Sequence, residues 1–123
     1  MLITDSECPT FELDGLTVTG LAAPSRGARE TCVWRLRLAP GTDGAPHCVD
    51  REEIFVALAG AATVRMAGRE HSLDAGAALV VPPHTEFSVA NRGTEEFDAF
   101  CVLPVGGRAA YPGWEPFTPP WAE

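Results

Sequence analysis

Lysine is absent from this sequence of 123 residues, and its nine basic residues are all arginines set singly along the chain. Without a lysine the protein cannot form a Schiff base with a carbonyl substrate or hold pyridoxal phosphate through an imine. The formal net charge is −8, and no cluster of arginines could neutralise a row of phosphates. We therefore expect no nucleic-acid partner and no binding to an anionic membrane surface.

Long apolar runs, a secretory leader and paired cysteines are also missing. No stretch approaches the roughly 18 apolar residues of a membrane-spanning helix. The N-terminus, MLITDSECPT, has no basic start followed by an apolar segment. The cysteines are widely spaced and form no CxxC pair: Cys8, Cys32, Cys48 and Cys101. We expect a cytoplasmic protein with reduced thiols.

No segment has the period of an amphipathic helix over three turns. Instead, clusters rich in glycine and proline separate short segments that alternate or are rich in β-branched and aromatic residues. The sequence predicts roughly nine or ten short strands and an all-β sandwich or barrel. The clearest predicted strands are Leu16–Leu21, Thr31–Leu38, Ile54–Leu58, Ala62–Met66, Leu79–Val81, Glu86–Ala90 and Phe97–Leu103.

Two segments show how side chains divide between core and surface. In Thr31–Leu38 the alternation puts Trp34, Leu36 and Leu38 on one face, and a period of two predicts that this face is inside. The last twelve residues, PGWEPFTPPWAE, contain four prolines, which forbid a central strand or helix. Their aromatic residues need burial, so we expect an extended tail held across the body of the protein.

Residues 41–60 carry a spaced set of chemically distinctive side chains. The segment GTDGAPHCVDREEIFVALAG contains Gly41, His47, Glu53 and Gly60, with Val49 two residues after the histidine. A second set follows in residues 76–91, where Gly76, Pro82 and Asn91 flank a segment with His84 and Phe87.

These two segments resemble the two sequence motifs of the cupin superfamily, and residues 63–76 between them look like the hairpin that joins the motifs in cupins. The resemblance implies one cupin domain over residues 1–123, a jelly-roll-like antiparallel β-barrel, with residues 104–123 as a Pro/Trp-rich tail. Cupins hold a metal at the barrel mouth with three histidines and a glutamate. This chain keeps His47 and Glu53 and has Val49 and Phe87 where the other two histidines are expected.

The chemistry of this donor set can be judged without the family. First-row metals in proteins normally take three or four ligands from His, Cys, Asp or Glu, and neither Val49 nor Phe87 can donate an electron pair. We therefore expect no tightly bound cofactor. The alternative is a divalent metal (Zn, Fe, Mn or Ni) on His47 and Glu53, with His84, Cys101 or the substrate completing the ligand set.

His47 and Glu53 are the candidate catalytic residues. A buried carboxyl group near an imidazole can work as a general acid and base. The other interpretation is a hydrogen-bonded structural pair that remains from a metal-binding ancestor. We expect the following residues to line an apolar pocket with few polar points: Trp34, Val49, Phe55, Phe87 and Cys101. We expect these residues to point outward or lie at the rim: Cys48, Glu52, His71 and His84.

Three functions remain open at this point. The first is a small-molecule-binding barrel, either a metal-independent enzyme of isomerase or cyclase type or a binding protein with an apolar pocket. The second is a metal-dependent, dioxygenase-like enzyme with a reduced ligand set, and the third is a non-catalytic binding or sensing protein. In each case we expect a homodimer that pairs through the N-terminal strands and the Trp-rich tail, because closed two-fold pairs are the commonest oligomers.

Overall fold

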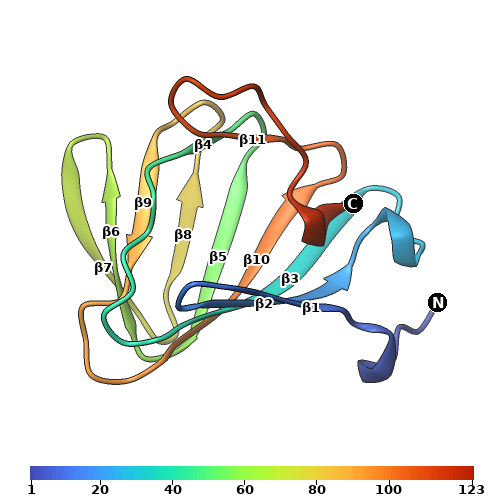
Figure 1. The fold of residues 1–123 in the computed structure, drawn as a ribbon, viewed down its shortest axis with the longest axis horizontal. Coiled ribbons are helices and arrows are strands. Elements are labelled where there is room, and N and C mark those ends of the chain that lie inside the picture. Colours follow the sequence, from blue (N-terminus) through green and yellow to red (C-terminus); the bar gives the residue numbers. More distant parts are fainter.

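The computed structural model describes residues 1–123 and contains strands, turns and three short 3₁₀ helices, with no α-helix (Figure 1). The all-β prediction is therefore confirmed. The strands are β1 (Thr10–Leu13), β2 (Leu16–Ala22), β3 (Thr31–Leu38), β4 (Cys48–Val49), β5 (Glu53–Ala59), β6 (Ala61–Met66), β7 (Arg69–Asp74), β8 (Ala78–Val81), β9 (Phe87–Ala90), β10 (Phe97–Pro104) and β11 (Ala109–Ala110). The 3₁₀ helices are η1 (Asp5–Glu7), η2 (Pro24–Arg26) and η3 (Pro120–Ala122).

The strands form two facing layers with antiparallel pairing throughout. One layer is a six-stranded sheet in the order β1-β2-β3-β10-β5-β8. The other combines the three-stranded sheet β7-β6-β9 with the pair β11-β4. A bridge between His47 and Phe87, with N···O distances of 3.0 and 2.9 Å, joins these two parts. The sheets do not close completely, so the barrel is a jelly-roll-like sandwich that is open at one end.

Strict alternation along the two central strands builds the core between the layers. In β3 the side chains of Trp34, Leu36 and Leu38 are buried, as their spacing predicts, and the arginines between them point outward. Arg35 binds Asp98 of the neighbouring strand β10, with Nε 2.9 Å from the carboxylate. In β10 every second side chain is buried, from Phe97 to Leu103. One cluster of buried residues fills the space between the sheets.

The motif positions that are not metal ligands hold the fold together. Asn91 is buried, and its amide donates to the carbonyl oxygens of Leu38 at 2.9 Å and Glu95 at 2.8 Å. Gly60 has a φ of 73°, and a Cβ there would collide with the carbonyl oxygen of Glu96. Only glycine fits this turn without strain.

The C-terminal tail crosses the open end of the sandwich (Figure 1). Trp121 packs against Phe11 and Trp34, with ring centroids 6.0 and 6.4 Å away. The expectation that all the tail aromatics are covered is wrong for Trp114, which is 67% exposed. Trp114 lies in a turn, and its ring centroid is 5.3 Å from that of Tyr111 in an edge-on arrangement.

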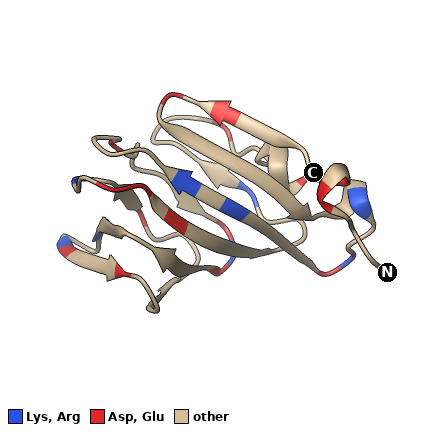
Figure 2. Ribbon diagram, turned by 90° about the horizontal axis from the view of Figure 1, so that it is seen from below, with Lys and Arg blue, Asp and Glu red and all other residues tan.

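Charged residues are spread over strands and loops with no block of one sign (Figure 2). No helix in the structure has the length and apolar character needed to cross a membrane.

Candidate functional site

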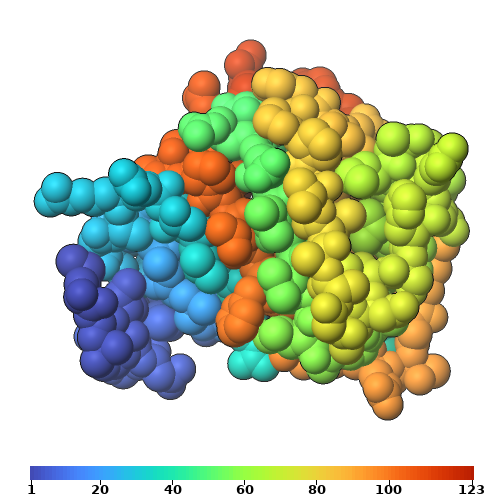
Figure 3. Space-filling model, turned by 180° about the vertical axis from the view of Figure 1, so that it is seen from behind, coloured from blue at the N-terminus to red at the C-terminus, as the bar shows by residue number.

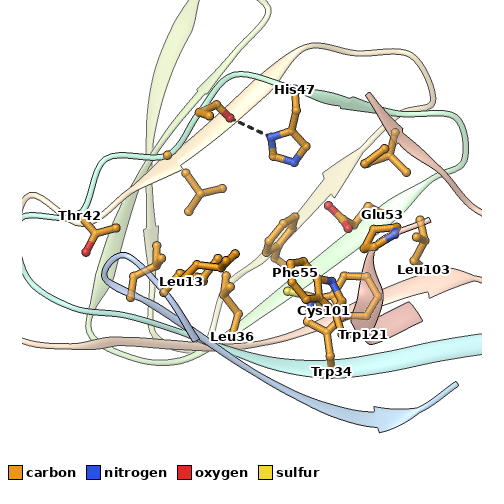
Figure 4. Close-up of a pocket in the computed structure, with 18 of the residues that line it drawn as sticks. Leu13, Trp34, Leu36, Thr42, His47, Glu53, Phe55, Cys101, Leu103 and Trp121 are labelled. Carbon is orange, nitrogen blue, oxygen red and sulfur yellow. Dashed lines mark hydrogen bonds between the residues drawn. The ribbon is translucent and has the colours of Figure 1, made fainter. Parts of the chain in front are cut away.

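A cavity of about 220 Å³ lies between the two layers and is lined in part by residues of the tail (Figure 4). Of its 22 lining residues, 15 are hydrophobic, so a bound molecule would be held mainly by apolar contacts. An apolar cavity of about 150 Å³ accommodates a benzene molecule. This cavity therefore suits a compound of one or two rings.

Aromatic side chains from three parts of the chain form much of its wall. Trp34 comes from β3 and Phe55 from β5, and the structure puts both of these predicted residues in the lining. Tyr111, Phe117 and Trp121 come from the tail and are not among the predicted lining residues. The signal that could have found them is the need to bury aromatic side chains in a segment whose prolines forbid regular structure.

Glu53 begins β5, and its side chain projects into the cavity (Figure 4). The residue is 5% exposed, and its carboxyl group has no hydrogen-bond or ion-pair partner in the protein. Burial raises the pKa of Glu53 to about 8, because the charged form is poorly solvated in an apolar cavity. At neutral pH the group is mostly protonated and can donate a hydrogen bond to a ligand.

His47 lies on the segment that precedes β4, above Glu53 in the view of Figure 4. Its Nδ1 is 2.9 Å from the carbonyl oxygen of Ala45. Because a carbonyl oxygen only accepts, Nδ1 carries the proton and Nε2 keeps a free electron pair. Burial lowers the pKa of His47 below its usual value, and the bond to Ala45 partly opposes this shift. The imidazole is therefore a neutral base at pH 7.

His47 and Glu53 share the cavity but do not touch. No hydrogen bond or ion pair joins them, so the structure gives no support to a hydrogen-bonded structural pair. A protonated acid and a neutral base that line one cavity without a hydrogen bond between them are both available to a bound molecule. This arrangement suits proton transfer to one atom of a ligand and from another.

Val49 and Phe87, which stand where the resemblance implies histidines, differ in their position relative to the cavity. Val49 lines the cavity as predicted, whereas Phe87 does not. Phe87 is 1% exposed and packs behind the wall, with its ring centroid 4.5 Å from that of His47 and 5.8 Å from that of Phe55. The expectation that Phe87 faces the cavity is corrected, since its ring is covered by these two neighbours.

Cys101 lies on the buried face of β10 and lines the cavity beside Trp34 and Phe55, its partners in the adjoining strands. Burial, together with the nearby carboxyl group of Glu53, raises the pKa of its thiol well above the usual value. A thiol in this state is a weak nucleophile, so Cys101 acts here as an apolar wall residue.

The residues present do not fit the metal site that the resemblance implies. No group of three or more His, Cys, Asp or Glu side chains is arranged to hold a metal ion. His84 is exposed on the loop before β9, where its positive φ of 61° fills a position that favours glycine. It does not join His47 and Glu53. Glu52 and His71 are exposed as expected, and Cys48 is partly buried.

Several solved structures share this fold at low sequence identity. The polyketide cyclase RemF from Streptomyces resistomycificus superposes with a TM-score of 0.75 and 15% identity, covering 85% of this chain and 78% of that one. A predicted oxalate decarboxylase from Thermotoga maritima gives 0.73 and 18%, covering 85% and 98%. Salicylate 1,2-dioxygenase from Pseudoaminobacter salicylatoxidans gives 0.71 and 22%, covering 86% of this chain and 31% of that one.

A search of curated proteins finds no match. The family model described as the cupin domain matches residues 34–103, which is more than half of the chain. This range contains both spaced motifs, the central strands of the six-stranded sheet and the residues His47 and Glu53. The chain therefore belongs to the cupin family.

Proposed function

We propose that this protein is a metal-independent enzyme of isomerase or cyclase type that moves protons on a small apolar substrate. The observation that carries the proposal is the unpaired carboxyl group of Glu53, buried in an apolar cavity that also contains the neutral base His47. A group in a cavity whose pKa is strongly perturbed by burial is a candidate functional residue. The fold-level likeness to a polyketide cyclase supports the proposal without deciding the substrate.

The chemical step we propose is the enolisation of a ketone. Nε2 of His47 removes a proton from the carbon next to the carbonyl group, and the C–H electron pair becomes the new C=C bond. The carbonyl π electrons move to oxygen, which takes the proton of Glu53. Isomerisation follows when a proton returns to a different carbon, and cyclisation follows when the enol carbon attacks a second carbonyl group.

The test uses 2-tetralone, an uncharged two-ring ketone of suitable size for the cavity, dissolved in deuterium oxide. We expect the protein to accelerate exchange of the α-protons, measured by NMR. Glu53→Gln and His47→Ala should each lower kcat/KM by about 100-fold or more, the usual contribution of a general acid or base. Glu52→Gln, which changes the exposed neighbouring carboxylate, is the matched control.

The pH dependence of the exchange provides a second readout. As the pH rises, the rate should first increase, because His47 loses its proton at a pH below its ordinary pKa of 6.5. It should then decrease near pH 8, because Glu53 ionises and can no longer donate its proton. Equal rates in the parent protein, Glu53→Gln and His47→Ala would contradict the proposal. A rate that requires an added divalent metal would favour the metal-dependent alternative.

A further inference from the structure

The cavity offers no positive charge to an anionic ligand. None of the nine arginines lines it, and the chain has no lysine. The carboxylates of Asp14 and Asp43 belong to the lining and are exposed, so they lie where the cavity meets solvent. An anion that approached the opening would meet two like charges in a protein whose net charge is already −8.

The inner wall holds no cation and no ion pair. Glu53 is buried without a partner, Nδ1 of His47 is bound to the carbonyl oxygen of Ala45, and the remaining deep residues are apolar or aromatic. A ligand with a full charge of either sign would lose its hydration there without gaining a counter-charge, and this desolvation costs more than apolar contacts return.

The unpaired acid nevertheless requires a partner of definite chemistry. The carboxylic acid of Glu53 is a hydrogen-bond donor with no acceptor in the protein, and it projects into the cavity (Figure 4). A neutral oxygen acceptor, such as a ketone carbonyl, satisfies this donor without bringing a charge. Trp34, Phe55 and Trp121 surround the same space with flat apolar surface, which suits a planar ring system.

From this arrangement we infer that the site selects its substrate by charge: it takes uncharged carbonyl compounds of one or two rings and excludes carboxylates of the same shape. The inference rests on the proposed function for the role of Glu53, and it names the substrate class of that site. It separates this protein from an enzyme that acts on small carboxylates, for which the cavity supplies no cationic anchor.

Calorimetric titration at pH 7 with three ligands of matched shape tests this inference. The probes are 2-acetylnaphthalene, 2-naphthoate and 2-naphthylmethylammonium, which are neutral, anionic and cationic. We expect the ketone to bind at least about tenfold more tightly than either charged compound, because only the charged groups are desolvated without a partner. Binding of 2-naphthoate within a factor of about three of the ketone, tighter binding of the ammonium compound, or no binding of the ketone would each overturn the inference.

A pair of double variants identifies the residues responsible. In Asp14→Asn/Asp43→Asn the ratio of the naphthoate and ketone dissociation constants should fall severalfold, since two repulsive charges at the opening are removed. Asp5→Asn/Asp74→Asn removes the same amount of charge from exposed positions outside the lining. The ratio should stay at the parent value in this control. An equal fall in both double variants would show only the effect of net charge and would contradict a role for the opening.

The calorimetric titration and the exchange assay test the charge selection and the proposed reaction separately. If the ketone binds selectively while 2-tetralone shows no catalysed exchange, the charge selection stands and the proposed reaction is wrong. If exchange is catalysed while 2-naphthoate binds as tightly as the ketone, the reaction stands and the charge selection is wrong.

Discussion

The buried carboxyl group of Glu53 links the stability of the protein to pH. Its pKa is about 8 in the folded protein and near 4.5 in an exposed carboxyl. The folded state therefore holds the proton more tightly than the unfolded state does. The contribution of Glu53 to the free energy of unfolding is largest below about pH 4.5, falls as the pH rises between these two values, and is lost above pH 8.

Glu53→Gln removes this dependence, because the amide that replaces the carboxyl group does not ionise. Between about pH 5 and pH 9 the stability of the parent protein should fall by roughly 3–5 kcal/mol relative to the variant. Urea denaturation at each pH measures the difference, with Glu52→Gln as the matched control at an exposed position. If the parent and Glu53→Gln respond identically to pH, the carboxyl group is solvated and the proposed acid loses its basis.

For single residues, the sequence predicts which side chains share the cavity but not how they are oriented. The motif spacing predicts that His47, Val49 and Glu53 share one space, and all three line the cavity. His47 and Val49 are two residues apart in an extended segment and point to the same side, whereas Glu53 begins a separate strand, β5. The direction of an aromatic ring depends on its neighbours. Phe87 packs behind His47 and Phe55 for that reason, and no local spacing encodes it.

The C-terminal tail is the element that turns an open sandwich into a closed cavity. Its residues 109–121 supply three of the aromatic wall residues, and the backbone of Ala109 pairs with Phe117 at 2.8 Å in both directions. The chain end is fixed as well, since the carbonyl oxygen of Glu123 accepts the backbone N–H of Ser25 at 3.2 Å. The tail is therefore a structural wall, and its side chains set the depth of the cavity.

Trp121→Ala should enlarge the cavity and destabilise the protein by roughly 2–4 kcal/mol, since the indole contacts Phe11 and Trp34. Ligand preference should shift toward three-ring ketones, which calorimetry can measure beside urea denaturation. Trp114→Ala is the matched control and should change stability by less than about 0.5 kcal/mol, because its side chain is exposed. Equal losses in the two variants would contradict the assignment of Trp121 to the wall.

The elements that the sequence predicts well are those that bury every second side chain. The strands β3 and β10 do so along their whole length, and their bounds agree with the pattern to within one residue. The strand β7 is expected only from the resemblance, as part of the hairpin between the two motifs, because of its six residues only Leu73 is buried. Its place in the sheet comes from backbone pairing with β6, which leaves no periodic signal in the side chains.

At the scale of the whole molecule, the outer face of the six-stranded sheet is unusually apolar. The strands β10, β5 and β8 lie side by side across it (Figure 3). Val56, Leu58 and Val80 are 37%, 42% and 50% exposed, and Ile54 is paired with both Val80 and Val102. The strand β5, EIFVALA, thus has apolar residues on both faces, whereas a strand with one solvated face alternates.

We expect a homodimer, and the structure adds a third candidate surface to the predicted tail and N-terminal strands. In the tail, Phe117 and Trp121 pack against their own chain, whereas Leu13 at the end of β1 is 56% exposed. The outer face of β5 and β8 is the larger apolar surface, and two copies related by a two-fold axis can cover it.

Light scattering at micromolar concentration should give the mass of a dimer. Val56→Arg/Val80→Arg should give a monomer with an unchanged circular dichroism spectrum, because both side chains are exposed. Leu2→Arg, at an N-terminal residue that is 83% exposed, should leave the dimer intact. A monomeric parent protein would show that the face stays uncovered, and dissociation by Leu2→Arg alone would move the interface to the N-terminal segment.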